Sequence, residues 1–220
     1  GNPPWERIKY EVKDFQIYLT NDVRKKLKRG NNLLGKFVRK SGEYNLSGVG
    51  DTNIYAIFVE LMYKILANNG KAGIIVPTGI ATDNTTKYLF QDIINNKRLS
   101  SIFDFDNKYG LFPSVHREYK FSLFTINGKN LKCTSFMTSF FLKKIEELKD
   151  LDRKIEMQLE DIKLFNPLTS TCPTFYSKAD YNIFKKIYKK THFLLGLISE
   201  EVSSTIKFNI KFLRMFDPDN

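Results

Sequence analysis

The segment from residue 51 to residue 77 constrains the fold more than any other part of the chain. Asp51-Thr52-Asn53 is a helix-capping signal, and residues 54–66 are apolar nearly all round, which predicts a buried helix. Asn68-Asn69-Gly70 marks the end of that helix. Residues 71–77 then predict a short, buried strand in a parallel sheet. A strand that directly follows a buried helix indicates an α/β domain.

The remaining segments continue this alternation as far as residue 137 and then change character. The spacing of apolar residues predicts helices over residues 11–29 and 85–96, an irregular loop over 30–52, and strands over 99–106, 119–127 and 130–137. Asn127-Gly128 predicts a turn. Helices are expected over residues 140–152 and 179–190, with a solvated, charge-rich face over 143–163. We therefore expect a sheet-forming region over residues 1–137 and a helical extension over 138–220.

The first five residues carry the strongest chemical signal. In Asn2-Pro3-Pro4-Trp5, the two prolines fix φ near about −65° and remove two backbone donors, which holds a carboxamide and a carbonyl beside an aromatic ring. This geometry suits the exocyclic amine of a planar base, because the two oxygens accept its protons while the ring stacks on the base. The amine nitrogen can then attack an electrophilic methyl group. The alternative is an ordinary turn or polyproline segment, and no strand precedes the motif to order it.

Charge and composition restrict the partners. The chain has 220 residues and a net charge of +11, with a pI near 9.5. This excess favours a polyanionic partner such as nucleic acid, or it reflects a Lys-rich protein from an AT-rich genome. Cys133 and Cys172 have no metal-type spacing, and with only two histidines no metal site is expected. The sparse cysteines favour a reduced, cytoplasmic location. No apolar run approaches the roughly 20 residues of a membrane span, so no membrane partner is expected.

Several motifs in a fixed order extend the signal of the opening residues. They are residues 1–9, 50–55, 72–77, 111–113 with 119–121, and 166–173. In this order they resemble the catalytic half of N6-adenine DNA methyltransferases of the Eco57I-like type, which serve restriction-modification or phage defence. The resemblance covers most of residues 1–190. It implies an α/β fold, namely the second half of a Rossmann-like methyltransferase sheet followed by a helical extension.

The resemblance also implies roles for single residues. Asn2 and the Pro3 carbonyl would accept from the N6 amine of a flipped adenine, Pro4 would keep the loop rigid, and Trp5 would stack on the base. Phe112 matches the family's second stacking aromatic, although a core role is the alternative, and Phe121 is a rival that strand alternation places in the core. Asp51, Asn53 and Tyr55 match a motif near the pocket, although Asp51 can equally cap the following helix.

Partners and cofactor follow from the same resemblance. S-adenosylmethionine would donate the methyl group, yet the Gly-rich turn that binds it after a strand is missing from this sequence. We therefore expect a segment of a larger protein, inactive alone, that acts with the cofactor-binding half and a specificity domain on double-stranded DNA. Arg7, Lys9, Arg117 and Lys120 are candidates for DNA phosphate contacts, with a solvated surface as the alternative.

Two other functions remain open from the sequence. The motif also suits methylation of RNA adenine or of a protein glutamine amide, which would keep the chemistry and change the substrate. A non-catalytic DNA-binding module is the other alternative, and it requires no role for Asn2. His116 could act as a base, but a surface or DNA-facing position is expected, because it lies beside Arg117. The proposed chemistry needs positioning and electrostatics and no general base.

Overall fold

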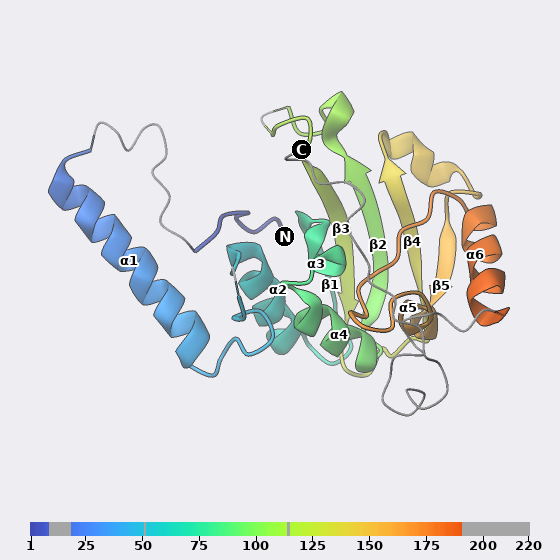
Figure 1. Ribbon diagram of the computed structural model, residues 1–220, viewed down its shortest axis with the longest axis horizontal. Coiled ribbons are helices and arrows are strands. Elements are labelled where there is room, and N and C mark those ends of the chain that lie inside the picture. Colours follow the sequence, from blue (N-terminus) through green and yellow to red (C-terminus); the bar gives the residue numbers. More distant parts are fainter. Residues whose placement is uncertain (9–18, 51, 114, 191–220) are drawn as a thin grey trace, which may run out of the picture.

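A computed structural model describes residues 1–8, 19–50, 52–113 and 115–190 of the chain (Figure 1). The strands are β1 (Lys71–Pro77), β2 (Leu99–Asp106), β3 (Lys120–Asn127), β4 (Ser135–Leu142) and β5 (Ile155–Gln158). The α-helices are α1 (Asn21–Lys40), α2 (Ile54–Ile65), α3 (Gly79–Thr82), α4 (Lys87–Asn95), α5 (Leu159–Phe165) and α6 (Lys178–Lys190). Two 3₁₀ helices, η2 (Asn107–Tyr109) and η3 (Ile145–Lys149), lie in connections. The α/β class is confirmed.

The five strands form one mixed sheet in the order β1-β3-β2-β4-β5. Strands β2 and β4 are parallel, whereas the other neighbouring pairs are antiparallel. The prediction of a parallel β1 is therefore wrong for its pairing with β3, which inserts antiparallel between β1 and β2. Local sequence does not report such an insertion, because the pairing joins segments about 50 residues apart.

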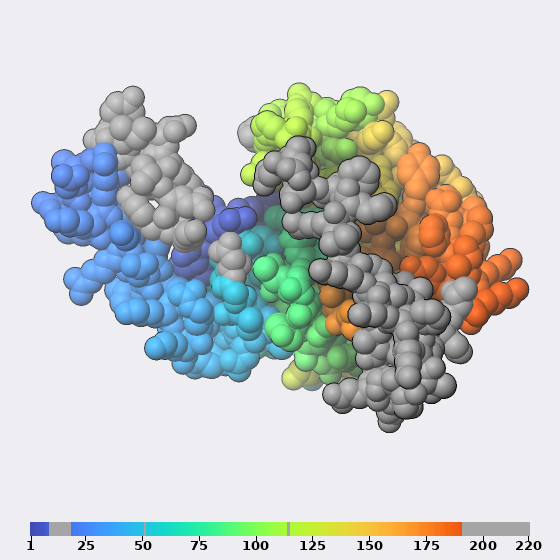
Figure 2. All heavy atoms as spheres, viewed as in Figure 1, coloured from blue at the N-terminus to red at the C-terminus, as the bar shows by residue number. Residues whose placement is uncertain are grey.

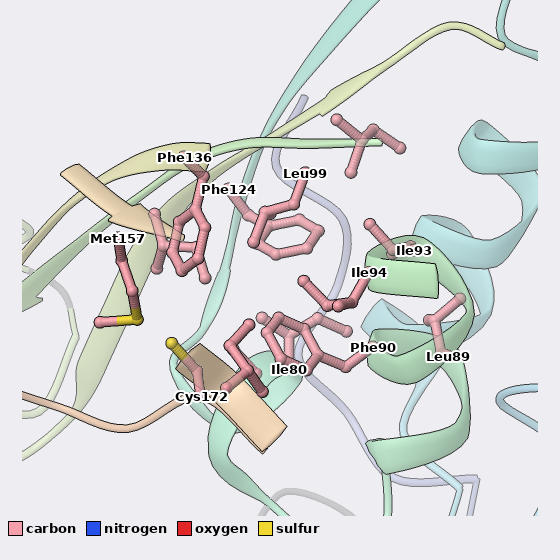
Figure 3. Close-up of a cluster of buried hydrophobic side chains, with 14 of the residues drawn as sticks. Ile80, Leu89, Phe90, Ile93, Ile94, Leu99, Phe124, Phe136, Met157 and Cys172 are labelled. Atoms are coloured by element: carbon pink, nitrogen blue, oxygen red, sulfur yellow. The ribbon is translucent and has the colours of Figure 1, made fainter. Parts of the chain in front are cut away.

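The main core lies between one face of the sheet and the helices that cover it. Figure 3 shows Ile80 of α3 and Phe90 and Ile93 of α4 packed against Phe124 of β3 and Phe136 of β4. Residues of α2, α5 and α6 belong to the same cluster, so five of the described helices contribute to this core. The opposite face carries only a small buried cluster, which consists of Phe105, Phe121 and Leu142. The sheet is thus covered unequally on its two faces.

The predicted helices at residues 54–66, 85–96 and 179–190 correspond to α2, α4 and α6. Helix α2 is not buried all round, because Phe58, Leu61 and Ile65 point to solvent and Ile65 is 72% exposed. Helix α1 continues to Lys40, so the loop predicted over residues 30–52 is wrong for its first part. Residues 11–18 of that predicted helix lie outside the described residues.

The largest error concerns residues 130–163. Strand β4 begins at Ser135 and runs to Leu142, where a helix was predicted over 140–152. The run Phe140-Phe141-Leu142 lies in the sheet, and Phe140 and Leu142 are fully buried there. The charge-rich stretch contains β5 and α5, with Ile155 and Met157 in the core. The predicted boundary at residue 137 falls inside β4, so the sheet extends past it.

Among the described residues, no helix is long and apolar enough to cross a membrane.

Candidate active site

The opening loop is held at both ends by backbone hydrogen bonds. The Gly1 amine donates to the Gly73 carbonyl at 2.7 Å, and the Ile75 amide donates to the Gly1 carbonyl at 2.8 Å. At the other end, the Ile54 amide donates to the Glu6 carbonyl at 2.8 Å and the Ile8 amide to the Thr52 carbonyl at 3.0 Å. Residues 2–5 therefore span two fixed points. The order that an upstream strand was expected to supply comes from β1 and from the start of α2.

Two oxygen acceptors of this loop have no partner within the described part of the chain. Asn2 is exposed, and its carboxamide makes no hydrogen bond with another described residue. Pro3 is buried, and its carbonyl likewise makes none there. A buried carbonyl is normally hydrogen-bonded, so an acceptor held without a partner is available to a ligand. The two oxygens belong to adjacent residues and can accept both protons of one amine.

A cavity of about 320 Å³ opens beside these acceptors. Its walls combine the opening loop with the loop that follows β2: Asn2, Pro3, Pro4, Trp5, Phe112 and Val115. The volume lies within the range of small-molecule sites, at its lower end. None of the lining side chains is charged, so the site suits a flat, neutral group with a few polar edges. The cavity thus brings together the four residues of the opening motif and Phe112, which lies at least 107 positions away in the sequence.

The aromatic residues divide between the cavity wall and the core behind it. Phe121 is 3% exposed and stacks on Phe105, with ring centroids 5.4 Å apart. Trp5 lies against Phe121 at 6.5 Å, and Phe112 meets it edge-on at 4.8 Å. Phe121 is therefore a core residue that supports the two rings of the wall. Trp5 and Phe112 are half-buried, which leaves part of each ring at the cavity.

The loop that carries Phe112 is organised by Asn107, which the sequence analysis did not single out. Asn107 is fully buried, and its carboxamide nitrogen donates to the carbonyls of Phe112, Val115 and His116 at 2.9 to 3.3 Å. Its carboxamide oxygen accepts from the Phe112 amide at 2.9 Å. Both cavity residues of this loop are thus tied to one side chain. An Asn directly after a strand is a turn signal, but its partners are known only once the loop is folded.

The predicted pocket residues at the start of α2 lie elsewhere. Asn53 occupies the N-cap position, forms a bridge to Arg7 and does not line the cavity. Tyr55 is buried in the main core, and burial, with a contribution from Asp83, raises the pKa of its phenol to about 12. Asp51 lies outside the described residues. The start of α2 therefore contributes to the cavity only by fixing the backbone of residues 6–8, which follow the opening motif.

The candidate phosphate-binding residues that the structure describes, Arg7, Arg117 and Lys120, are exposed and do not line the cavity. Arg7 is exposed, and its backbone forms a bridge to Asn53. Lys9 lies outside the described residues. The Arg117 guanidinium folds back over Gly110 and donates to the Lys108 carbonyl at 3.3 Å. Lys120 is exposed and lies 5.5 Å from the ring centre of Phe141. His116 is exposed and is not part of the cavity wall, which fits the surface position predicted for it.

Comparison with known proteins gives one family and several distant structures. Residues 1–112 match the Eco57I restriction-modification methylase family. No curated protein sequence matches the chain. The type IIG restriction endonuclease BpuSI aligns over 70% of the chain with 17% identity and a TM-score of 0.42. A chain from a structural study of the assembly and conformational transition of the type I R-M system aligns over 92%, with 12% identity and a TM-score of 0.45. The DrdV–DNA complex aligns over 72%, with 10% identity and a TM-score of 0.42.

The chain is much shorter than these structures. It spans 19% of the BpuSI chain, 43% of the type I system chain and 16% of the DrdV chain.

Proposed function

Because the chain belongs to the Eco57I restriction-modification methylase family, we propose that it provides the base-binding part of a DNA adenine methyltransferase. The reaction is methyl transfer to the N6 amine of an adenine that has left the duplex, since the base edge is out of reach inside the stack. The observation that supports this substrate is the cavity between the opening loop and Phe112, with two unpaired acceptors at its edge.

In this proposal the base lies between the half-buried rings of Trp5 and Phe112. Stacking on aromatic rings contributes about 1 to 3 kcal/mol per base and holds the base without regard to its identity. The Asn2 carboxamide oxygen and the Pro3 carbonyl then select for an exocyclic amine, because both can only accept its protons. The two acceptors also draw electron density onto the nitrogen, which raises its ability to attack a methyl carbon.

The cavity supports catalysis by positioning. None of its lining residues titrates near neutral pH, so the described wall holds no general base. Fixed acceptors that point at the reacting amine act in a partly dry site, where their electrostatic effect exceeds that in water. The amine gives up its proton after the methyl group is transferred.

S-adenosylmethionine is the methyl donor in this proposal, and it supplies an electrophilic methyl group when bound. The described residues do not fit a complete site for it: Gly48, Gly50, Gly70 and Gly73 form no Gly-rich turn after a strand, and the cavity wall has no charged group for the amino-acid end. We propose that the cofactor is held mainly by another part of the full-length protein. A specificity domain there, and action on cellular DNA in the cytoplasm, belong to the same proposal.

The test is the content of N6-methyladenine in the DNA of cells that express the full-length protein. Wild type is compared with Asn2→Ala and with Asn182→Ala, a matched change at an exposed residue of α6. We expect methylation in one sequence context for wild type and the control. For Asn2→Ala we expect a loss of about 100-fold or more, by analogy with removal of one polar group that stabilises a transition state.

Other outcomes assign other functions. If the soluble protein leaves DNA unmethylated but methylates RNA or a protein glutamine, the chemistry stands and DNA is the wrong substrate. If none of these is methylated and Asn2→Ala binds DNA as wild type does, the chain is a DNA-binding module and the proposed reaction is wrong.

A further inference from the structure

Helix α1 stands apart from the sheet and its covering helices. Figure 1 shows it as an arm (blue) on the side of the molecule where the opening loop lies. Its contacts with the described body lie near its C-terminal end, where Val38 is buried and Phe37 meets Tyr44 at 6.3 Å. Figure 2 shows α1 (blue) on one side of the opening residues (dark blue) and the loop after β2 (yellow-green) on the other. The helix thus lies on the side of the molecule that carries the cavity-forming opening loop.

The surface of α1 is divided by charge. At 3.6 residues per turn, six basic residues fall within about 120° of its circumference. All six are exposed: Lys25, Lys28, Arg29, Lys36, Arg39 and Lys40. The apolar residues Val23, Leu27 and Leu34 lie on the opposite side, together with the buried Val38. The helix therefore has an apolar side, which is buried only near the C-terminal end at Val38, and a separate basic face.

This basic face is not neutralised by ion pairs within the described part of the chain. None of the six basic residues forms an ion pair with a described residue. Asp22 is the one acidic residue within α1. Faces that serve only solubility mix both signs of charge, because like charges in close succession repel one another. A single-sign face without counter-charges favours a polyanion as its partner.

We propose that the basic face of α1 binds the phosphate backbone of the DNA duplex beside the base that enters the cavity. This inference rests on the proposed function for its choice of partner. From Lys25 to Lys40 the face is about 22 Å long, at 1.5 Å per residue. The duplex axis advances about 3.4 Å for each phosphate of one strand, so a face aligned with the axis spans about six phosphates. The loop after β2, on the other side of the opening residues, adds the exposed Lys108 and Arg117.

The test measures DNA affinity as a function of salt in the full-length protein. The variant K25Q/K28Q/K36Q/K40Q removes four charges with little effect on helix propensity. The control K178Q/K186Q/K189Q/K190Q removes four exposed charges from α6, at the far end of the molecule. Each phosphate contact contributes about 0.9 to the slope of log K against log salt. We expect the α1 variant to lower that slope by about 3 to 4 and the control to change it much less.

The outcomes separate this proposal from the proposed reaction. Equal slopes for the α1 variant and the α6 control would overturn it, and so would binding of α1 to anionic lipid vesicles with DNA affinity unchanged. Asn2→Ala should bind DNA with the wild-type slope. If no protein methylates DNA but the α1 variant alone loses the salt-dependent binding, the proposed reaction fails and the role of α1 stands.

Discussion

At the scale of single residues, the cavity depends on a side chain that does not line it. The Asn107 carboxamide makes four hydrogen bonds to the backbone of residues 112–116, and these bonds set the position of Phe112 and Val115. The opening motif was singled out by its residue types and Phe112 by the family resemblance, and both line one cavity, while their part in base binding stays a prediction. Asn107 could not be predicted from sequence, since its partners become neighbours only when the loop closes.

Asn107→Ala should weaken methyl transfer while leaving the global fold in place. It leaves backbone groups of the loop without partners, at a cost of about 1 to 3 kcal/mol for a buried group. We expect kcat/KM to fall at least tenfold. We also expect the fluorescence of 2-aminopurine at the target position to be quenched less, because Phe112 is no longer held where it could stack on that base. Asn182→Ala serves as the control.

Asn107→Asp separates the donor role from the acceptor role. A carboxylate still accepts from the Phe112 amide but cannot donate to the three carbonyls. It should therefore be as defective as Asn107→Ala. Wild-type quenching in Asn107→Asp would show that the donated bonds do not position Phe112.

At the scale of elements, local pattern was reliable where a segment was strongly apolar and bounded by turn residues. β1, β2 and β3 were predicted within one residue of their ends. The pattern failed in β4, where the predicted helix begins inside a strand that packs against β2 and β5. It also failed in α1, because Gly30, Asn31 and Asn32 are poor helix formers and still lie within the helix. The energy that decides such segments comes from neighbours distant in sequence.

The junction of β2, β4 and α3 carries a buried carboxyl group. Asp104 accepts from the Thr78 hydroxyl and from the Phe141 amide, the latter at 3.1 Å. Phe141 has a φ of 59°, which is unusual for an aromatic residue and accompanies a shift of register between β2 and β4. Burial raises the pKa of Asp104 above the ordinary value of 3.8, although the bonds from Thr78 and Phe141 lower it. Asp104 thus ties the end of β1 to an irregular position in β4.

The raised pKa of Asp104 predicts a dependence of stability on pH. A carboxyl whose pKa is higher in the folded state stabilises the fold fully below its unfolded pKa, and this contribution is lost as pH rises through the folded pKa. Asp104→Asn has no charge to bury, and it can still accept from Phe141 and donate to the Thr78 oxygen. In urea unfolding, its stability relative to wild type should therefore increase as pH rises above about 4.

A second variant tests the hydrogen bonds at the same position. Asp104→Leu leaves the Phe141 amide unpaired and should be less stable than Asp104→Asn by about 1 to 3 kcal/mol at every pH, because neither side chain titrates. A difference between Asp104→Asn and wild type that is constant with pH would contradict the assigned titration. Equal stability of the Leu and Asn variants would contradict the role of the bonds to Phe141 and Thr78.

At the scale of the whole molecule, helices cover one face of the sheet, whereas the other face is only partly buried. On that second face, Ile75, Phe103 and Leu123 are only partly buried. The α/β class could be predicted from the order of elements, but the strand order could not, because it rests on pairings between distant segments.

We expect the 220-residue chain to show no methyl transfer by itself in a sensitive radiolabel assay, and measurable turnover would refute this.

The outer edge of β1 allows a direct test of whether another strand joins the sheet. Gly1 lies between the Gly73 carbonyl and the Ile75 amide, which is the hydrogen-bond pattern of parallel strands. The amide and carbonyl of one strand residue point to the same side, so the Gly73 amide also points outward, away from β3. If residues before Gly1 continue this parallel ladder in the full-length protein, the Gly73 amide donates to the carbonyl two residues before Gly1.

Amide hydrogen exchange can therefore test whether a further strand joins this edge. The Gly73 amide should exchange slowly in the full-length protein and fast in a protein that starts at Gly1. The Ile74 amide points to β3 and should be protected in both, which makes it the internal control. Equally fast exchange at Gly73 in both proteins would mean that no strand joins this edge. A separate cofactor-binding part, as proposed above, would then be expected to contact the partly exposed face of the sheet.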